Sequence, residues 1–149
     1  MKGWLLDTNV IAEVSGARPN PRVLAWIEAQ SEPTLYLSIL TLAEYRKGIE
    51  RLEPGDKLRP RLERAVASLA ERFAGRVLPV SNNVALCWGA ISGQVKRRSG
   101  QAPPVIDTLL AATAIEHGLY LATRNVADVE QSGAVVFNPW KDDPAEFCL

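Results

Sequence analysis

Short apolar runs alternate with longer segments of helical spacing along the 149 residues, and this alternation constrains the fold more than any other feature. It is the pattern of units in which parallel β-strands are joined by helical crossovers. The runs that predict strands are Trp4–Leu6, Leu35–Ser38, Val77–Val80, Leu119–Ala122 and Ala134–Phe137. We therefore expect an α/β fold with a mainly parallel five-stranded sheet flanked by helices, in a single domain over residues 1–149.

Apolar residues recurring every three or four positions predict the connecting helices. These are expected around residues 10–14, over 23–30, around 42–49, over 58–74, around 84–95 and from 103 to 117. The helix over 58–74 is rich in charge, and its apolar stripe of Leu62, Ala65, Val66 and Leu69 is expected to face inward. Pro79 places the third strand at a sheet edge or at a strand end.

Composition limits the chemistry that is open to this chain. Seventeen Lys and Arg balance seventeen Asp and Glu, so no overall charge indicates a nucleic-acid or membrane partner. The chain reaches Asp7 after a few apolar positions, too few for a signal peptide or a membrane span, so we expect a cytoplasmic protein. Cys87 and Cys148 form no Cys-x-x-Cys pair, and His117 is the only histidine. The usual structural zinc sites and most histidine-based triads are therefore excluded, and any catalysis must rest on carboxylates.

The acids of interest lie where parallel strands present functional groups, just beyond their carboxyl ends. Asp7 directly follows the first strand, and Glu44 lies about one turn into the helix after the second. Asp107 lies in the first turns of the helix that Pro103 and Pro104 open. Asn125 and Asp128 follow the fourth strand. These segments are expected to present polar groups at one end of the sheet.

Each acid alone also has a purely structural interpretation. Asp7 suits a helix N-cap, and Thr41 with Glu44 fits a capping box. Asp107 near a helix start is favoured by the helix dipole, and Asp128 suits the cap of a short helix beginning at Val129. For Glu44, Asp107 and Asp128, taken singly, these interpretations outweigh a catalytic role.

Apolar neighbours shift the balance toward a site, because they place Asp7, Glu44 and Asp107 at the border of the core. Converging carboxylates repel one another, by about 4 kcal/mol for a pair at about 4 Å and an effective dielectric of about 20. A domain with roughly 5–15 kcal/mol of stability would hardly keep such a cluster without a cation. Oxygen ligands without Cys or His favour Mg²⁺ or Mn²⁺, and such a site suits phosphodiester hydrolysis.

The ordered set of motifs resembles the PIN-domain ribonucleases, most closely the VapC-type toxins of bacterial VapBC toxin–antitoxin pairs. The matching stretches span nearly the whole chain in the family's order. They are the run from Leu5 to Ile11, Ser38-x-x-Thr41-x-x-Glu44, the helix from Asp107 to Ala114, Ala122-Thr123-Arg124-Asn125, and the terminal Val136 to Trp140.

The resemblance implies a PIN-like fold and cleavage of RNA that depends on Mg²⁺ or Mn²⁺. It assigns Asp7 and Asp107 as the principal metal ligands and Glu44 as a third acid. Asn125 stands where members commonly have another acid, which favours one firmly held ion. Asp128 is a candidate substitute for that acid. The resemblance further implies a homodimer and a cognate antitoxin whose tail occupies the acidic pocket, with no membrane association.

Further side chains are candidates for supporting roles around these acids. Thr8 and Thr123 are placed to orient carboxylates, and Arg46, Lys47 and Arg124 adjoin the acid-bearing segments and are candidates for phosphate binding. For each of them a structural or solvated role is the simpler interpretation.

Other functions remain open from the sequence. Asp7 could be the covalent nucleophile of an aspartyl-phosphatase loop, although the second acid of such a loop is here Asn9. The domain could instead be a receiver-like binding module or a non-catalytic PIN scaffold. A receiver needs adjacent acids near the first strand and a lysine beyond a late strand, and neither is evident.

Overall fold

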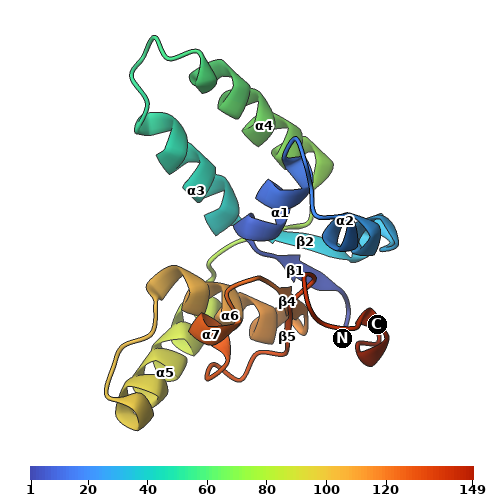
Figure 1. Cartoon of the computed structure of the whole chain (residues 1–149). Helices are drawn as coiled ribbons and strands as arrows, with labels where there is room; N and C mark the ends of the chain where they lie inside the picture. Colours follow the sequence, from blue (N-terminus) through green and yellow to red (C-terminus); the bar gives the residue numbers. More distant parts are fainter.

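The computed structural model describes residues 1–149, and its centre is a five-stranded sheet in the order β3-β2-β1-β4-β5 (Figure 1). Every pair of neighbouring strands is parallel. The strands are Trp4–Leu6 (β1), Leu35–Ser38 (β2), Val77–Leu78 (β3), Tyr120–Ala122 (β4) and Val136–Phe137 (β5). The predicted α/β fold is confirmed, with β3, β4 and β5 shorter than their apolar runs. β3 is an edge strand that ends before Pro79, as predicted.

Helices connect the strands and cover both faces of the sheet (Figure 1). They are Thr8–Ser15 (α1), Pro21–Glu28 (α2), Ile39–Glu50 (α3), Leu58–Arg72 (α4), Asn82–Ser99 (α5), Val105–His117 (α6) and Val126–Val129 (α7), with 3₁₀ turns at Glu32–Thr34 and Pro144–Glu146. The last α-helix differs from expectation. α7 begins at Val126 rather than Val129, so Asp128 lies inside it and does not cap it.

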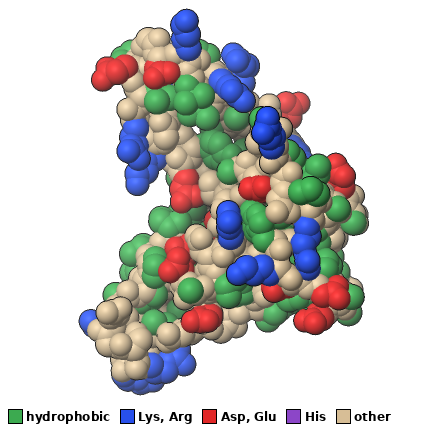
Figure 2. Space-filling view, in the orientation of Figure 1, with side chains coloured by type: hydrophobic (Ala, Val, Ile, Leu, Met, Phe, Trp, Pro, Cys, Tyr) green, Lys and Arg blue, Asp and Glu red, His purple; other side chains and the backbone are tan.

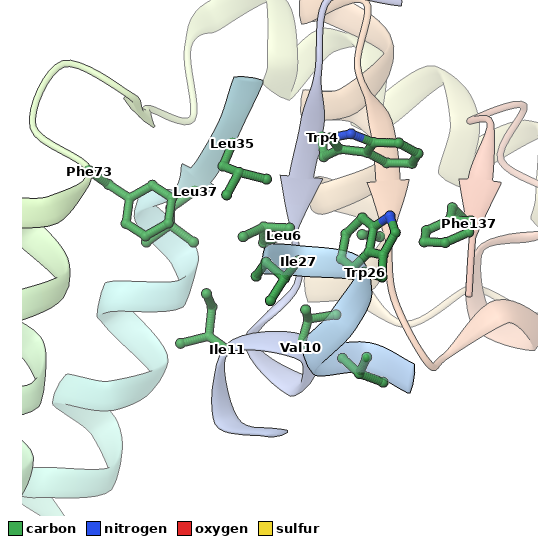
Figure 3. Packing of buried hydrophobic residues seen from close by; sticks show 12 residues of the cluster. Trp4, Leu6, Val10, Ile11, Trp26, Ile27, Leu35, Leu37, Phe73 and Phe137 are labelled. Carbon is green, nitrogen blue, oxygen red and sulfur yellow. The ribbon is translucent and has the colours of Figure 1, made fainter. Parts of the chain in front are cut away.

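The core is divided between the two faces of the sheet because successive side chains of a strand point to opposite sides. Trp4 and Leu6 of β1 belong to a cluster with α1 and α2, whereas Leu5 packs with α6 and α7. Figure 3 shows the first cluster, in which Trp4 lies beside Trp26 and Phe137 at ring-centroid distances of 5.2 and 5.0 Å. The aromatic packing fixes β1, and β1 carries Asp7 at its end.

α3 and α4 form a hairpin that extends away from the sheet (Figure 1). α4 packs mainly on α3, and its predicted inward-facing stripe is less buried than expected, since no residue of α4 is fully buried. Leu62, Ala65, Val66 and Leu69 are only half-buried. α3 begins directly after β2, at the edge of the sheet, and continues into this hairpin. The side chains of its first turns therefore lie beside the ends of the strands.

The register aligns the carboxyl ends of the three central strands. Leu6 lies opposite Leu37 in β2 and Ala122 in β4. The next residues along these strands, Asp7 and Thr123 among them, therefore emerge side by side at one edge. The Asp7 amide also donates to the Ala122 carbonyl at 3.0 Å, which continues the pairing to this point. No helix is both long and apolar enough to cross a membrane.

The aromatic cluster predicts a large and local stability effect. Phe137 is fully buried and contacts Trp4, Trp26 and Phe147. Phe137→Ala should lower the free energy of unfolding by about 3–5 kcal/mol through lost burial and the cavity left behind. Leu149 is 54% exposed, so Leu149→Ala should stay within about 0.5 kcal/mol. Urea denaturation of both variants measures this, and equal effects would contradict the packing described.

Candidate active site

Asp7 is the most buried acid of the molecule. It ends β1 and caps α1, and only 5% of its surface is exposed. Its Oδ1 accepts the Thr8 amide at 2.6 Å, so the capping interpretation is correct. Its Oδ2 accepts the hydroxyl of Thr123 at 2.6 Å and the amide of Asn9 at 2.8 Å. Capping and a place in a site are compatible here, because the same carboxylate serves both.

Burial raises the pKa of Asp7, because the ionised form is poorly solvated. The hydrogen bonds from Thr123 and from the Thr8 amide lower this pKa in part, and the charges of Asp107 and Glu44 raise it further. Direct hydrogen bonds to the carboxylate are thus the main compensation for its burial within the chain itself.

Glu44 lies on α3, and the expected capping box is wrong. The N-cap of α3 is Ser38, whose hydroxyl accepts the Leu40 amide at 3.1 Å. Thr41 and Glu44 therefore lie inside the helix. The Thr8 hydroxyl donates to Oε2 of Glu44 and shares a 3.1 Å hydrogen bond with the Thr41 hydroxyl. Glu44 is tied to the residue that follows Asp7, which fits a shared site better than a helix cap.

Asp107 lies in the first turn of α6, whose N-cap position is occupied by Pro104. Burial raises the pKa of Asp107, hydrogen bonding from Asn125 lowers it, and the charges of Asp128 and Glu44 raise it further. The helix-start placement of Asp107 is as predicted, and it also brings this acid toward Glu44 and Asn125.

One cavity of about 440 Å³ contains all four predicted site residues. Asp7, Glu44, Asp107 and Asn125 line it together with Thr8, Asn9, Ala12 and Ile106. No Lys or Arg forms an ion pair with any of the three acids. The carboxylates are also not drawn into a closed three-ligand cluster of the kind that holds a metal ion by itself. They form an open acidic cavity, and we call it the acidic cup.

Asp128 stands beside this cavity rather than in it. Its charge acts on Asp107, but its side chain lines a separate cavity of about 180 Å³ with Gln131, Ser132 and the end of α5. The sequence did not predict the role of Asn9, whose side-chain amide donates to Asp7 and, at 3.2 Å, to the hydroxyl of Thr123. The available signal was its position two residues after Asp7, in the first turn of α1.

The chain is similar in sequence to a known domain family and to named proteins. The family model of the PIN domain matches residues 4–127. The VapC ribonuclease Y4jK of Sinorhizobium fredii is 39% identical over 92% of this chain and 97% of its own length. Toxin FitB of Neisseria gonorrhoeae is 40% identical over 93% of this chain and 99% of its own. The chain belongs to the PIN-domain family, among the VapC-type toxins.

A solved structure agrees in fold with almost the whole molecule. The crystal structure of FitAcB from Neisseria gonorrhoeae matches with a TM-score of 0.81 and 39% sequence identity. The match covers 92% of this chain and 98% of the solved chain. The PIN-like architecture predicted from the sequence is therefore confirmed.

The charges in the acidic cup predict that removing one of them stabilises the metal-free protein. Asp107→Asn should raise Tm in the presence of chelator by at most about 2–4 °C, because solvent screening at this partly exposed side chain keeps the gain below about 1 kcal/mol. The reason is that burial and repulsion by Asp128 and Glu44 make the ionised form of Asp107 unfavourable in the folded protein.

The pH dependence follows from the direction of the shift. Because the pKa of Asp107 is higher in the folded state than in the unfolded chain, its ionisation destabilises the fold as pH rises through that interval. The gain from Asp107→Asn should therefore be present at pH 7 and vanish below the unfolded pKa of about 4. Differential scanning calorimetry measures it, with the exposed Glu130→Gln as control. A Tm unchanged or lowered at pH 7 would show that the acids do not oppose folding.

Proposed function

We propose that this protein is an endoribonuclease that hydrolyses RNA phosphodiester bonds with the help of Mg²⁺ or Mn²⁺, as the toxin of a toxin–antitoxin pair. The observation that carries the proposal is the acidic cup, in which three carboxylates line one open cavity without a basic partner. Its ribonuclease activity is further supported by the similarity to the VapC ribonuclease Y4jK.

The donor set fits a hard divalent cation. The cup offers carboxylate, amide and hydroxyl oxygens and no sulfur or imidazole, which is the preference of Mg²⁺ and Mn²⁺. Asp7 and Asp107 are the proposed ligands, with Glu44 as the third acid. When bound, such an ion lowers the pKa of a water molecule and stabilises charge on the phosphate oxygens.

The chain itself fixes the acids before any substrate arrives. Thr123 and Asn9 hold one oxygen of Asp7, and Thr8 holds one oxygen of Glu44. Side chains that are locked in this way keep their negative charge at defined positions, so little reorganisation is needed during the reaction. Asp107 is more exposed than Asp7, and hydrogen bonding from Asn125 lowers its pKa in part.

Two of the three other functions, the phosphatase and the passive scaffold, fit the structure less well than a nuclease. An aspartyl-phosphatase loop would need a second acid two residues after Asp7, but this position holds Asn9, whose side-chain amide donates to Oδ2 of Asp7. A passive scaffold would have no reason to keep three unpaired acids around one cavity. Calorimetric titration with Mg²⁺ separates the scaffold from the nuclease, because the scaffold need not bind the ion.

Partners follow from the same proposal. RNA is the proposed substrate, and the cytoplasm is the proposed place of action, where RNA is met. A cognate antitoxin is proposed because the chain is similar to Toxin FitB. A homodimer is proposed because α5 and α6, which pack on each other, expose apolar side chains such as Leu86 and Ile115.

Cleavage of RNA is the direct test of this function. Asp7→Asn and Asp107→Asn should each keep the fold and reduce Mg²⁺-dependent cleavage of total cellular RNA by about 100-fold or more, since each removes charge that positions the ion. Circular dichroism checks the fold, and gel analysis of the RNA measures cleavage. Undiminished cleavage by either variant would overturn the assignment, and Glu130→Gln is the control for charge alone.

Asn125 sets the charge of the cup and thereby its affinity for ions. We propose one firmly held ion, because a neutral amide occupies the position of a fourth acid. Asn125→Asp should bind Mn²⁺ more tightly, by about 10-fold, by adding a charged oxygen ligand. Isothermal titration calorimetry measures affinity and stoichiometry. An affinity equal to that of the parent would mean that residue 125 does not face the ion.

A further inference from the structure

A second cavity adjoins the acidic cup and shares one wall with it. This cavity of about 370 Å³ is lined by Leu40, Ala43, Glu44, Lys47, Gly48, Arg51 and Ile106. Glu44 and Ile106 also line the cup, so the two cavities adjoin along α3 and the start of α6 with these side chains between them. We call the second cavity the α3 groove. We propose that it binds a nucleotide of single-stranded RNA next to the scissile phosphate, with Lys47 and Arg51 as its phosphate contacts.

Lys47 and Arg51 are the free cations of this part of the molecule. They are four residues apart, so they lie on the same side of α3. Neither forms a side-chain hydrogen bond or an ion pair, whereas the nearby Arg46 and Arg59 both pair with Glu50. Figure 2 shows basic side chains on α3 next to the hollow that separates the α3–α4 hairpin from the rest of the molecule.

The helix terminus does not account for these two charges. Cations near a helix C-terminus often serve its unpaired carbonyls. Here Arg59 already donates to the carbonyls of Ile49 and Leu52, at 3.2 and 2.9 Å. Lys47 and Arg51 are therefore left exposed and without protein partners, beside a site whose own charge is negative.

The remaining surface of the groove suits a base or ribose. Leu40, Ala43 and Ile106 are apolar, and 39% of Ile106 is exposed although it lies between the two cavities. Apolar floor and paired cations together match a nucleotide that is turned out of a base stack, which is how single-stranded RNA is bound. The acids of the cup repel phosphates, so cations at the neighbouring position offset that repulsion and fix the strand.

The test compares the parent protein with a double variant that carries both Lys47→Gln and Arg51→Gln. The inference rests on the proposed function, so cleavage of a fluorescent 12-nucleotide single-stranded RNA with Mg²⁺ is the readout. The control double variant Lys2→Gln with Arg97→Gln removes the same charge from exposed positions away from the cup, at the amino end of β1 and the far end of α5.

The α3 groove predicts a specific pattern of kinetics. The double variant should raise KM by about 10-fold with kcat within about twofold, as expected when binding is lost equally from ground and transition states. The slope of log kcat/KM against log salt should become shallower by about 1.4, since each contact to single-stranded nucleic acid contributes about 0.7. The control double variant should match the parent in KM, kcat and slope.

Two results would overturn the inference and they differ from failure of the function itself. A KM unchanged from the parent, or one raised equally by the control variant, would show that the groove does not bind RNA. A fall in kcat alone would mean that Lys47 and Arg51 act on the cup and not on a neighbouring nucleotide. A parent protein that cleaves no RNA would instead refute the proposed function.

Discussion

The structure depends on a buried carboxylate at the end of the first strand. Asp7 is held by the Thr8 amide, by Thr123 and by Asn9, which come from the start of α1 and the end of β4. These bonds connect the sheet edge to the helix that follows it. Because burial penalises the charge and the bonds only partly offset it, Asp7 keeps a raised pKa in the folded protein. The same contacts therefore support the fold and hold a buried negative charge, which a bound cation would stabilise.

Parallel topology explains how remote acids reach this carboxylate. The ends of β1 and β4 are aligned by register, and α3 and α6 start at the same edge. Glu44 and Asp107 arrive on these two helices and remain without basic partners. Two unpaired cations, Lys47 and Arg51, line the neighbouring α3 groove. The molecule thus separates negative charge for an ion from positive charge for a polyanion, although its net charge is zero.

Sequence reasoning could predict the strands and the acids because both depend on local patterns. Apolar runs gave the five strands, and the position of Asp7 after the first run placed it at the sheet edge. Polar contacts were harder to predict. Thr41 and Glu44 have the spacing of a capping box, but the residue that caps α3 is Ser38. The place of Asp128 could not be predicted either, because it depends on the exact residue at which the short helix α7 begins. Which cations stay unpaired depends on tertiary contacts that no local pattern encodes.

The central claim is that Asp7, Glu44 and Asp107 act together as one cation site. Titration of the metal-free protein with Mg²⁺, followed by carbon-13 NMR of the side-chain carboxyl groups, tests it most directly. The account predicts that these three carboxyl signals shift together along one binding curve while exposed acids such as Glu130 do not move. Signals that stay still, or that shift with separate affinities, would contradict it.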